Sequence, residues 1–432
     1  MTSGLVLVLA FFILVALNMP IGFAIGLSTL AALITIMPFD PAATTMAQRM
    51  IAGLDSFTLL AIPFFILSGY LMGAGGVATR LIDAAKGLIG ALPGGLAVVN
   101  ILSCMLFGAV SGSAVAATSA IGSFMVPAMK KEGYDAPFAA SVTTSASILG
   151  LLIPPSNVMI VYAVAAGGVS IGALFLAGYG PGILAGIALI ATAMIIARRA
   201  RYPVSDRLPM RDSARMVVAA LPSIAMLLIV VGGIVAGFFT ATEASAFAVV
   251  YSLILGLAVH REMSWRDLPG IIVKSAETTG IVLFLIAVST GMAWMLAYSG
   301  LPGAIATSLL TIAENPLLLL LVINIILLVV GAFLDITPAI LIFTPILLPV
   351  AVALGISPVH FGMIMVFNLS IGLLTPPVGT VLFVGAAVSQ TKVAAMIKPL
   401  MPLYLALIVV LALTTIFPAL SEALPRAFGM ME

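Results

Sequence analysis

Long apolar stretches constrain this chain more than any other feature of its sequence. A helix needs about 20 mostly apolar residues to cross the core of a bilayer, and such stretches recur along all 432 residues. The first lacks a basic start and a small-residue cleavage site, so we expect it to be retained rather than removed as a signal peptide. The predicted crossings are residues 3–17, 20–37, 56–73, 137–166, 171–197, 216–237, 242–259, 276–298, 357–388 and 399–418. The sequence therefore predicts an all-α polytopic membrane protein.

Composition excludes several other classes. Only 7% of the residues are charged, against about 25% in a soluble domain. The net charge of +2 provides no broad basic face for nucleic acid. Cys104 is the single cysteine, and with two histidines it cannot form the clusters that zinc sites or Cys/His catalysis require. We therefore expect a membrane protein that is not an enzyme.

Two further apolar stretches, 93–131 and 316–352, each suit one long span or two short helices. Neither has a polar loop in its middle, but each has small or polar residues there. These are Ser111-Gly112-Ser113 in the first stretch and residues 335–338, Asp-Ile-Thr-Pro, in the second. Both stretches are therefore candidates for re-entrant helical hairpins.

The basic residues decide between these options, because Lys and Arg concentrate on the cytoplasmic side of membrane proteins. If both stretches are re-entrant, 15 of the 17 basic residues fall on one side, and only Arg49 and Arg426 on the other. A single crossing at either stretch mixes the two sides. We therefore predict ten crossings and two hairpins, with both termini outside. Residues 198–215, which contain six arginines, would form a cytoplasmic linker between two halves.

The two halves also repeat one another. The segment GLLIPP at 150–155 recurs as GLLTPP at 372–377, 222 residues later. The run from Pro93 to Gly108 has the same length as the run from Pro316 to Gly331. In the predicted topology the two hairpins open to opposite sides, so the repeat is inverted. Inverted repeats with broken helices are typical of secondary transporters, whose sites lie near the membrane midplane.

Each repeated Pro-Pro pair lies inside a long predicted crossing, 137–166 or 357–388. Proline removes a helical hydrogen bond and clashes with the preceding turn, so nearby carbonyl groups lose their partners. Such a break is tolerated at membrane depth only inside protein or beside a hydrated cavity. A bound cation would satisfy several carbonyls and a hydroxyl together.

The hairpin tips supply further polar groups. Ser111 and Ser113 offer hydroxyl and carbonyl oxygens to a hard cation, and any one such serine could instead serve only close helix packing. Asp335 and Thr337 begin the returning leg of the second hairpin, and we expect Asp335 to accept hydrogen bonds from substrate hydroxyls. Asn157, two residues after the first Pro-Pro pair, is also placed at the site.

Two other acids receive structural interpretations. Glu243 follows Thr240 by three residues at a helix start, and a capping role is favoured over transport. Glu277 is interpreted as the partner of Lys274 in an ion pair at the membrane boundary. Residues 76–92 and 263–275 have charges along short apolar faces, which indicates helices lying along the inner interface.

The chain resembles the large membrane subunit (M subunit, DctM-like) of a TRAP transporter, a tripartite ATP-independent periplasmic transporter. The resemblance covers nearly the whole chain and rests on four motifs together. These are FGAVSGS at 107–113, GLLIPPS at 150–156, TATEA at 240–244 and NLSIGLLTPPVG at 368–379.

The resemblance implies an elevator-type fold of the ion transporter superfamily and Na⁺-coupled import of carboxylate solutes across a bacterial inner membrane. A periplasmic binding protein would deliver the substrate, and a small four-helix membrane subunit would widen the scaffold. Scaffold residues would be 1–75, 167–262 and 276–298, with arm helices at 76–92 and 263–275. Transport residues would be 93–166 and 316–388, followed by a final helix and tail at 399–432.

Carried over residue by residue, the resemblance implies two Na⁺ sites and thus two or more coupling ions. The first would be Ser111, Ser113, Gly150, Ile153 and Pro155, and the second Gly331, Gly372, Thr375 and Val378, mostly through backbone carbonyls. The expected substrate contacts are Ser113, Ser156, Asn157, Asp335 and Thr337. No Lys or Arg falls at the tips or breaks, so hydroxyls, amides, half-helix ends or Na⁺ would have to meet a substrate carboxylate. Because Asp335 would suit a polyhydroxylated acid, a sugar acid is favoured over a dicarboxylate or another organic acid.

Several alternatives stay open at this point. Uptake could be coupled to protons rather than Na⁺, or could proceed without a binding protein in the same superfamily. A passive channel needs a continuous polar path, and the broken-helix repeat favours an occluding site instead. A scaffold subunit that transports nothing would not need the repeated Gly and Pro-Pro pattern.

Overall fold

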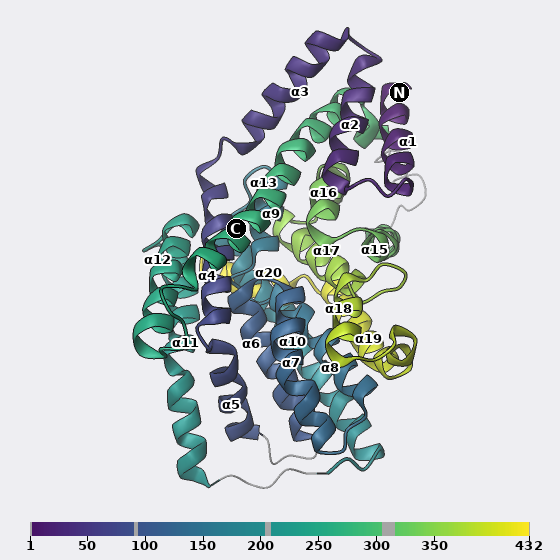
Figure 1. The fold of residues 1–432 in the computed structure, drawn as a ribbon. Coiled ribbons are helices and arrows are strands. Elements are labelled where there is room, and N and C mark those ends of the chain that lie inside the picture. Colours follow the sequence, from purple (N-terminus) through teal and green to yellow (C-terminus); the bar gives the residue numbers. More distant parts are fainter. Residues whose placement is uncertain (1, 90–93, 204–208, 305–315, 432) are drawn as a thin grey trace.

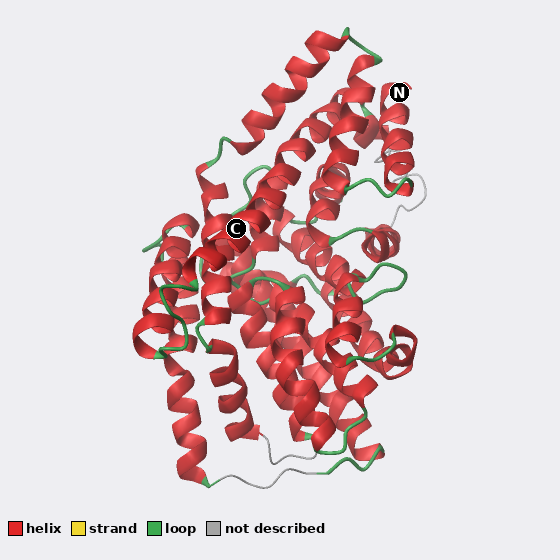
Figure 2. Ribbon diagram, in the orientation of Figure 1, coloured by secondary structure: helices red, strands yellow, loops and turns green. Residues whose placement is uncertain are grey.

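The computed structural model describes residues 2–89, 94–203, 209–304 and 316–431. Within these ranges the chain forms helices and no β-strand (Figure 2). Pro93, where the first hairpin was expected to begin, and Arg207 of the basic linker lie outside the described residues. Eight described helices are at least 18 residues long and apolar enough to cross a membrane, by length and composition. An all-α polytopic architecture is thereby confirmed.

One group of helices, here called the frame, lies in the left and upper parts of Figure 1. In Figure 1, α1 to α3 lie at one end and α5 at the other. Within the frame, α4 packs against α12 and α13, and α5 packs against α11. The frame consists of α1 (Thr2–Ala16), α2 (Ile21–Ile34), α3 (Phe39–Leu54), η1 (Phe57–Leu60), α4 (Ala61–Ala74), α5 (Val77–Ile89), α11 (Met210–Val235), α12 (Ala241–Ile254), η3 (Leu255–Val259) and α13 (Leu268–Ser299).

The remaining helices form a second group, here called the core bundle. It contains two helical hairpins and two broken helices at the positions that the sequence predicted. The first half is α6 (Gly95–Ser111), α7 (Ala114–Lys131), α8 (Ala136–Ser147), η2 (Ile148–Leu151) and α9 (Asn157–Ala165). The second half is α15 (Pro316–Phe333), α16 (Ile336–Ala353), α17 (Pro358–Gly372) and α18 (Thr380–Ser389). The bundle is completed by α10 (Ile171–Arg199), α19 (Val393–Ile416) and α20 (Ala419–Ala427).

The two halves of the core bundle exchange packing partners. The entering legs stay in their own half, since α6 packs on α8 and η2, and α15 packs on α17. The returning legs also reach across: α7 packs on α18, and α16 packs on α9. Both Pro-Pro peptide bonds, 154–155 and 376–377, are cis. The sequence repeat is therefore also a repeat in three dimensions.

Paired glycines set the distance between each hairpin and its broken helix. A Cβ atom built on Gly108 would lie 2.6 Å from the Cα of Gly150. In the second half, a Cβ atom on Gly372 would lie 2.5 Å from the Cα of Gly331. Both distances are too short for any side chain, so these backbones touch directly. The glycines of the repeated motifs are thus required by backbone contact.

The helix α10 belongs to the core bundle rather than to the scaffold predicted at 167–262. It packs against α6, α17, α19 and α20. Glycines explain this position, because a Cβ atom on Gly182 would lie 2.9 Å from the side chain of Ile153. The missing side chains let the first helix break sit directly against α10.

The predicted inner arm at 263–275 was also wrong as a separate element. Residues from Leu268 onward continue without interruption into α13, a helix of 32 residues. Pro269 stands in the first turn, where helices tolerate proline, and nothing between Lys274 and the next span ends the helix. The predicted ion pair between Lys274 and Glu277 is likewise absent from the described part of the chain.

The interpretation of Glu243 is confirmed. Its carboxylate accepts a hydrogen bond from the Thr240 backbone N–H at 2.8 Å, and its own N–H donates to the Thr240 hydroxyl at 3.2 Å. This reciprocal pair is a capping box at the start of α12.

A buried amide pair joins α15 to α17. The Asn368 amide nitrogen donates to the side-chain oxygen of Asn324 at 2.7 Å and to its backbone carbonyl at 3.0 Å. Substituting Asn368 with Ala leaves the side-chain oxygen of Asn324 buried without this partner, so we expect a loss of about 1–3 kcal/mol of stability. Thermal unfolding of the purified protein would measure it. In a double-mutant cycle, Asn324→Ala should add much less in the Asn368→Ala background; equal losses would contradict the pairing.

Candidate functional site

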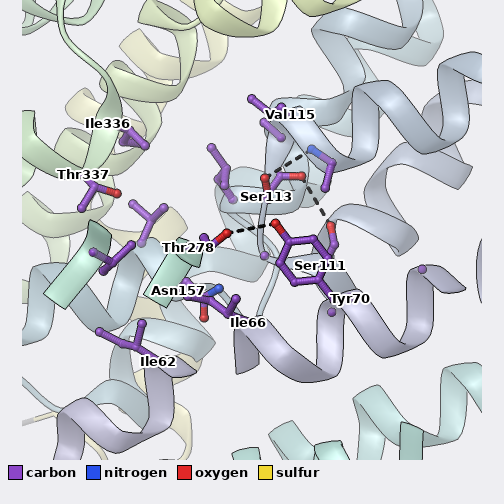
Figure 3. A pocket seen from close by; sticks show the side chains of 18 of the residues that line it. Ile62, Ile66, Tyr70, Ser111, Ser113, Val115, Asn157, Thr278, Ile336 and Thr337 are labelled. Atoms are coloured by element: carbon purple, nitrogen blue, oxygen red, sulfur yellow. Dashed lines mark hydrogen bonds between the residues drawn. The ribbon is translucent and has the colours of Figure 1, made fainter. Parts of the chain in front are cut away.

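A cavity of about 600 Å³ lies between the frame and the core bundle. Both hairpin tips line it, at Ser111 to Ala116 and at Asp335 to Thr337. The start of α9 lines it at Asn157, and α4 and α13 of the frame supply further lining residues. Figure 3 shows Thr337 and Ile336 on one side of this space and Ser111, Ser113 and Tyr70 on the other. Segments separated by more than 200 residues in the chain therefore share one cavity.

The first hairpin tip is a tight turn between α6 and α7. Gly112 has a φ of +61°, a left-handed conformation that favours glycine. Ser113 caps α7, since its hydroxyl accepts the Ala116 N–H at 3.3 Å. The Ser111 hydroxyl donates to the Ser113 carbonyl at 3.4 Å. The turn thereby concentrates serine oxygens at the cavity wall.

Asn157 connects this tip to the first helix break. A Cβ atom on Gly112 would lie 2.9 Å from the Asn157 amide nitrogen, so the amide packs directly on the turn. The Asn157 side-chain oxygen is buried, and within the described residues it has no hydrogen-bond partner. An unpaired buried oxygen beside a cavity is a ready acceptor for a ligand.

The second hairpin tip brings a carboxylate to the cavity. Asp335 occupies the N-cap position of α16, and its side chain is exposed rather than packed away. Thr337 follows it in the first turn and also lines the cavity. The expected substrate residues Ser113, Asn157, Asp335 and Thr337 thus lie around one space. Ser156 does not line it, since it is fully buried and its hydroxyl donates to the Leu151 carbonyl at 2.7 Å.

The frame contributes polar groups that the sequence analysis missed. Tyr70 of α4 and Thr278 of α13 line the cavity, and their hydroxyl oxygens are 3.0 Å apart (Figure 3). Lys274 lines it one turn before Thr278. The predicted interfacial arm at 263–275 placed this lysine outside the site. Its spacing of four residues from Thr278, on one helix face, was the available signal.

The residues expected for a first ion site lie around the Gly108–Gly150 contact. Ser111 is one turn after Gly108, and Gly150 belongs to η2. Ile153 is half-buried against α10, and Pro155 is buried in the break. Of this set, only Ser111 and Ser113 line the cavity. The rest form its supporting layer.

The residues expected for a second ion site lie around the Gly331–Gly372 contact. The Val378 N–H donates to the Ala332 carbonyl at 3.1 Å, which joins the second break to the entering leg of its hairpin. The Thr375 hydroxyl is 3.1 Å from both the Ile371 carbonyl and the Tyr404 hydroxyl. Carbonyl oxygens of Leu373 and Thr375 both face Gly379, where a Cβ atom would lie 3.0 and 2.9 Å from them. Hydroxyl and carbonyl oxygens therefore gather here.

The oxygen atoms of these two sets of residues are ligands of the kind that a hard cation prefers. Groups of three or more His, Cys, Asp or Glu side chains that could hold a transition metal do not occur in the described ranges. Neutral carbonyl and hydroxyl oxygens suit a hard cation instead.

Comparison with known proteins identifies the family. Residues 8–420 match the family described as "Tripartite ATP-independent periplasmic transporter, DctM component". The chain belongs to this DctM family. It is therefore a large membrane subunit of a TRAP transporter, a multi-pass transport protein and not an enzyme.

Relatives match this DctM-family chain along nearly its full length. The protein YgiK of Salmonella typhimurium is 50% identical over 97% of this chain and 96% of its own. The C4-dicarboxylate TRAP transporter large permease protein of Pseudomonas aeruginosa is 42% identical over 93% of this chain and 94% of its own. The sialic acid TRAP transporter large permease protein of Vibrio cholerae is 38% identical over 95% of this chain and 96% of its own.

A solved structure supports the fold. The YdaH transporter of Alcanivorax borkumensis superposes with a TM-score of 0.64 at 15% identity, covering 90% of this chain and 89% of that one. At this identity the likeness concerns the architecture alone, which is that of a polytopic helical transporter.

Proposed function

We propose that this DctM-family chain carries a carboxylate-bearing organic solute across the bacterial inner membrane by Na⁺-coupled secondary transport. One observation carries the proposal: the two hairpin tips and the first helix break, from both halves of the repeat, line a single cavity. In inverted-repeat transporters the substrate and the coupling ions bind at this place.

The cavity wall favours a sugar acid among the organic acids. The named relatives act on a C4-dicarboxylate in one case and on sialic acid in another. Here, Asp335 and the unpaired Asn157 oxygen supply hydrogen-bond acceptors for hydroxyl groups. A bare dicarboxylate would bring two negative charges towards Asp335 and offer it no donor.

Two groups of oxygens support Na⁺ as the coupling ion. Ser111 and Ser113 at the first tip, and Thr375 with the Leu373 carbonyl at the second break, are the chain's own groups that would hold it. When bound, Na⁺ would supply positive charge beside a substrate carboxylate. With two such clusters in the repeat, we propose two or more ions in each cycle.

The division into frame and core bundle supports an elevator movement. Both groups line the cavity: the frame contributes residues of α4 and α13, and the core bundle contributes the hairpins and α9. Sliding the core bundle along the frame would carry the cavity from one side of the membrane to the other. A periplasmic binding protein would deliver the solute, a small membrane subunit would complete the frame, and both termini would be periplasmic.

We predict that uptake by the complete assembly requires an inward Na⁺ gradient. The chain, its small subunit and its binding protein would be reconstituted in liposomes, and solute accumulation would be measured. Accumulation driven equally by a proton gradient without Na⁺ would favour proton coupling. Accumulation without the binding protein would favour an independent transporter.

The site assignment has its own test in the same assay. The double variant Ser113→Ala, Thr375→Ala should raise the Na⁺ concentration needed for half-maximal uptake about tenfold, because each change removes an oxygen ligand. Ser123→Ala is the control, since that hydroxyl is exposed and bonded within its own helix. An unchanged Na⁺ dependence in the double variant would contradict the assignment.

A further inference from the structure

The cavity contains one basic side chain, Lys274, within the part of the chain that the structure describes. The only other charged residue among the described lining residues is Asp335. Lys274 is exposed, and it belongs to neither of the two ion pairs found among the described residues. Among the described residues its ammonium group therefore has no ion-pair partner, and the other residues that line the cavity are neutral apart from one carboxylate.

The neighbouring hydroxyl groups leave the lysine as the available donor. The Thr278 hydroxyl donates to the Lys274 backbone carbonyl at 3.0 Å. Because the Thr278 proton is used in that bond, the Tyr70 hydroxyl is the donor in its own hydrogen bond with the Thr278 hydroxyl. The two oxygens are 3.0 Å apart and join α4 to α13. This chain of bonds fixes the two frame helices together beside Lys274. No described residue accepts a hydrogen bond from the three N–H donors of the ammonium group, which are therefore available to an anion.

We infer that Lys274 is a specificity-determining residue that attracts and binds the carboxylate group of the solute. Its place in transport rests on the function proposed above, while its attraction for anions does not. The residue stands on the frame, so a sliding core bundle would bring the solute to it at one end of the cycle only. By the charge distribution that end is cytoplasmic, which makes Lys274 a contact of the inward-facing cavity.

This role is unlike the ordinary role of a lysine at the inner membrane boundary. Such a lysine anchors a helix by reaching the lipid headgroups, and any other basic residue on that face would serve equally well. Lys274 instead shares a cavity with both hairpin tips. An anchoring role predicts no effect on anions inside the cavity, and this difference can be measured.

The first experiment needs no knowledge of the solute. Val115 of α7, which also lines the cavity and is 41% exposed, is changed to Cys as a reporter. The native Cys104 is fully buried and would not react. The rates at which an anionic and a cationic methanethiosulfonate modify the reporter are compared, with and without Lys274→Gln. We expect the anionic-to-cationic rate ratio to fall about fivefold in Lys274→Gln and to be kept in Lys274→Arg.

A matched control and a second assay complete the test. Lys392→Gln removes an equal charge from the same predicted face but outside the cavity lining, and it should leave the ratio unchanged. A ratio that does not change in Lys274→Gln would overturn the inference, whatever the transport assay shows. In the reconstituted assembly, Lys274→Gln should raise about tenfold the internal solute concentration that gives half-maximal exchange. The external solute concentration that gives half-maximal uptake should stay constant. Absence of Na⁺-driven uptake in the unmodified protein would count against the proposed function instead.

Discussion

Alanine at Gly108 or at Gly372 is expected to reduce initial solute uptake about tenfold or more. At each position a Cβ atom would fall within 2.6 Å of a backbone Cα on the facing element. Because the obstacle is backbone, it cannot rotate away as a side chain can. Forcing the elements apart costs about 1–3 kcal/mol and displaces the hairpin tip from the helix break. Uptake in the reconstituted assembly measures the effect.

The control for these variants is Gly232→Ala in α11, where the added Cβ meets no atom within 4 Å. We expect this variant to transport normally, since alanine also suits a helix interior better than glycine. Thermal unfolding separates a displaced tip from a failure to fold: the Gly108→Ala protein should unfold cooperatively at a lowered midpoint. Normal uptake by both Gly108→Ala and Gly372→Ala would contradict the close backbone contact.

Asparagine at Asp335 is expected to change the affinity for two kinds of acid in opposite directions. The carboxylate accepts hydrogen bonds from hydroxyl groups and repels a second carboxylate, and Asp335→Asn keeps the shape while removing the charge. Affinity for a polyhydroxylated monoacid such as gluconate should fall about tenfold to a hundredfold. Affinity for succinate, which has no hydroxyl group, should hold or rise.

These affinities are best measured on the membrane subunits alone, so that the binding protein's own selectivity does not enter. Thermal stabilisation of the purified complex by added solute, at saturating Na⁺, reports binding to the folded state. The isosteric change Thr337→Val serves as the comparison, because it removes a hydroxyl and leaves the charge. Equal losses of affinity for gluconate and succinate in Asp335→Asn would rule out that Asp335 binds the hydroxyl groups of the solute.

Much of the fold was predictable because its signals are local. Proline pairs, glycine turns and apolar lengths located both hairpins and both broken helices, and Thr240 with Glu243 located a helix start. The placement of α10 was not predictable in this way, since it depends on which glycine-lined face meets a distant break. The helix α3 was not predicted, because it is shorter than a membrane span and contains Asp40 and Arg49.

The candidate site also contains residues that local motifs predict and residues that depend on long-range packing. The tips and Asn157 could be assigned from motifs, because those residues interrupt helices where chemistry is possible. Ser156 was expected beside them, but the turn of the break directs its hydroxyl to Leu151. The frame wall with Tyr70, Thr278 and Lys274 depends on packing between α4 and α13, which the motifs of the repeat do not encode.

The exchange of hairpin legs has a consequence for how the halves can move. A rocker-switch cycle, in which two halves tilt apart about a central hinge, would pull α7 away from α18 and α16 away from α9 in the same step. Both are helix-on-helix contacts inside the bundle, and separating them would expose much packed apolar surface. The two interlocked halves are therefore suited to move as one rigid body. Both proposed ion sites and the solute would then cross the membrane together in one movement.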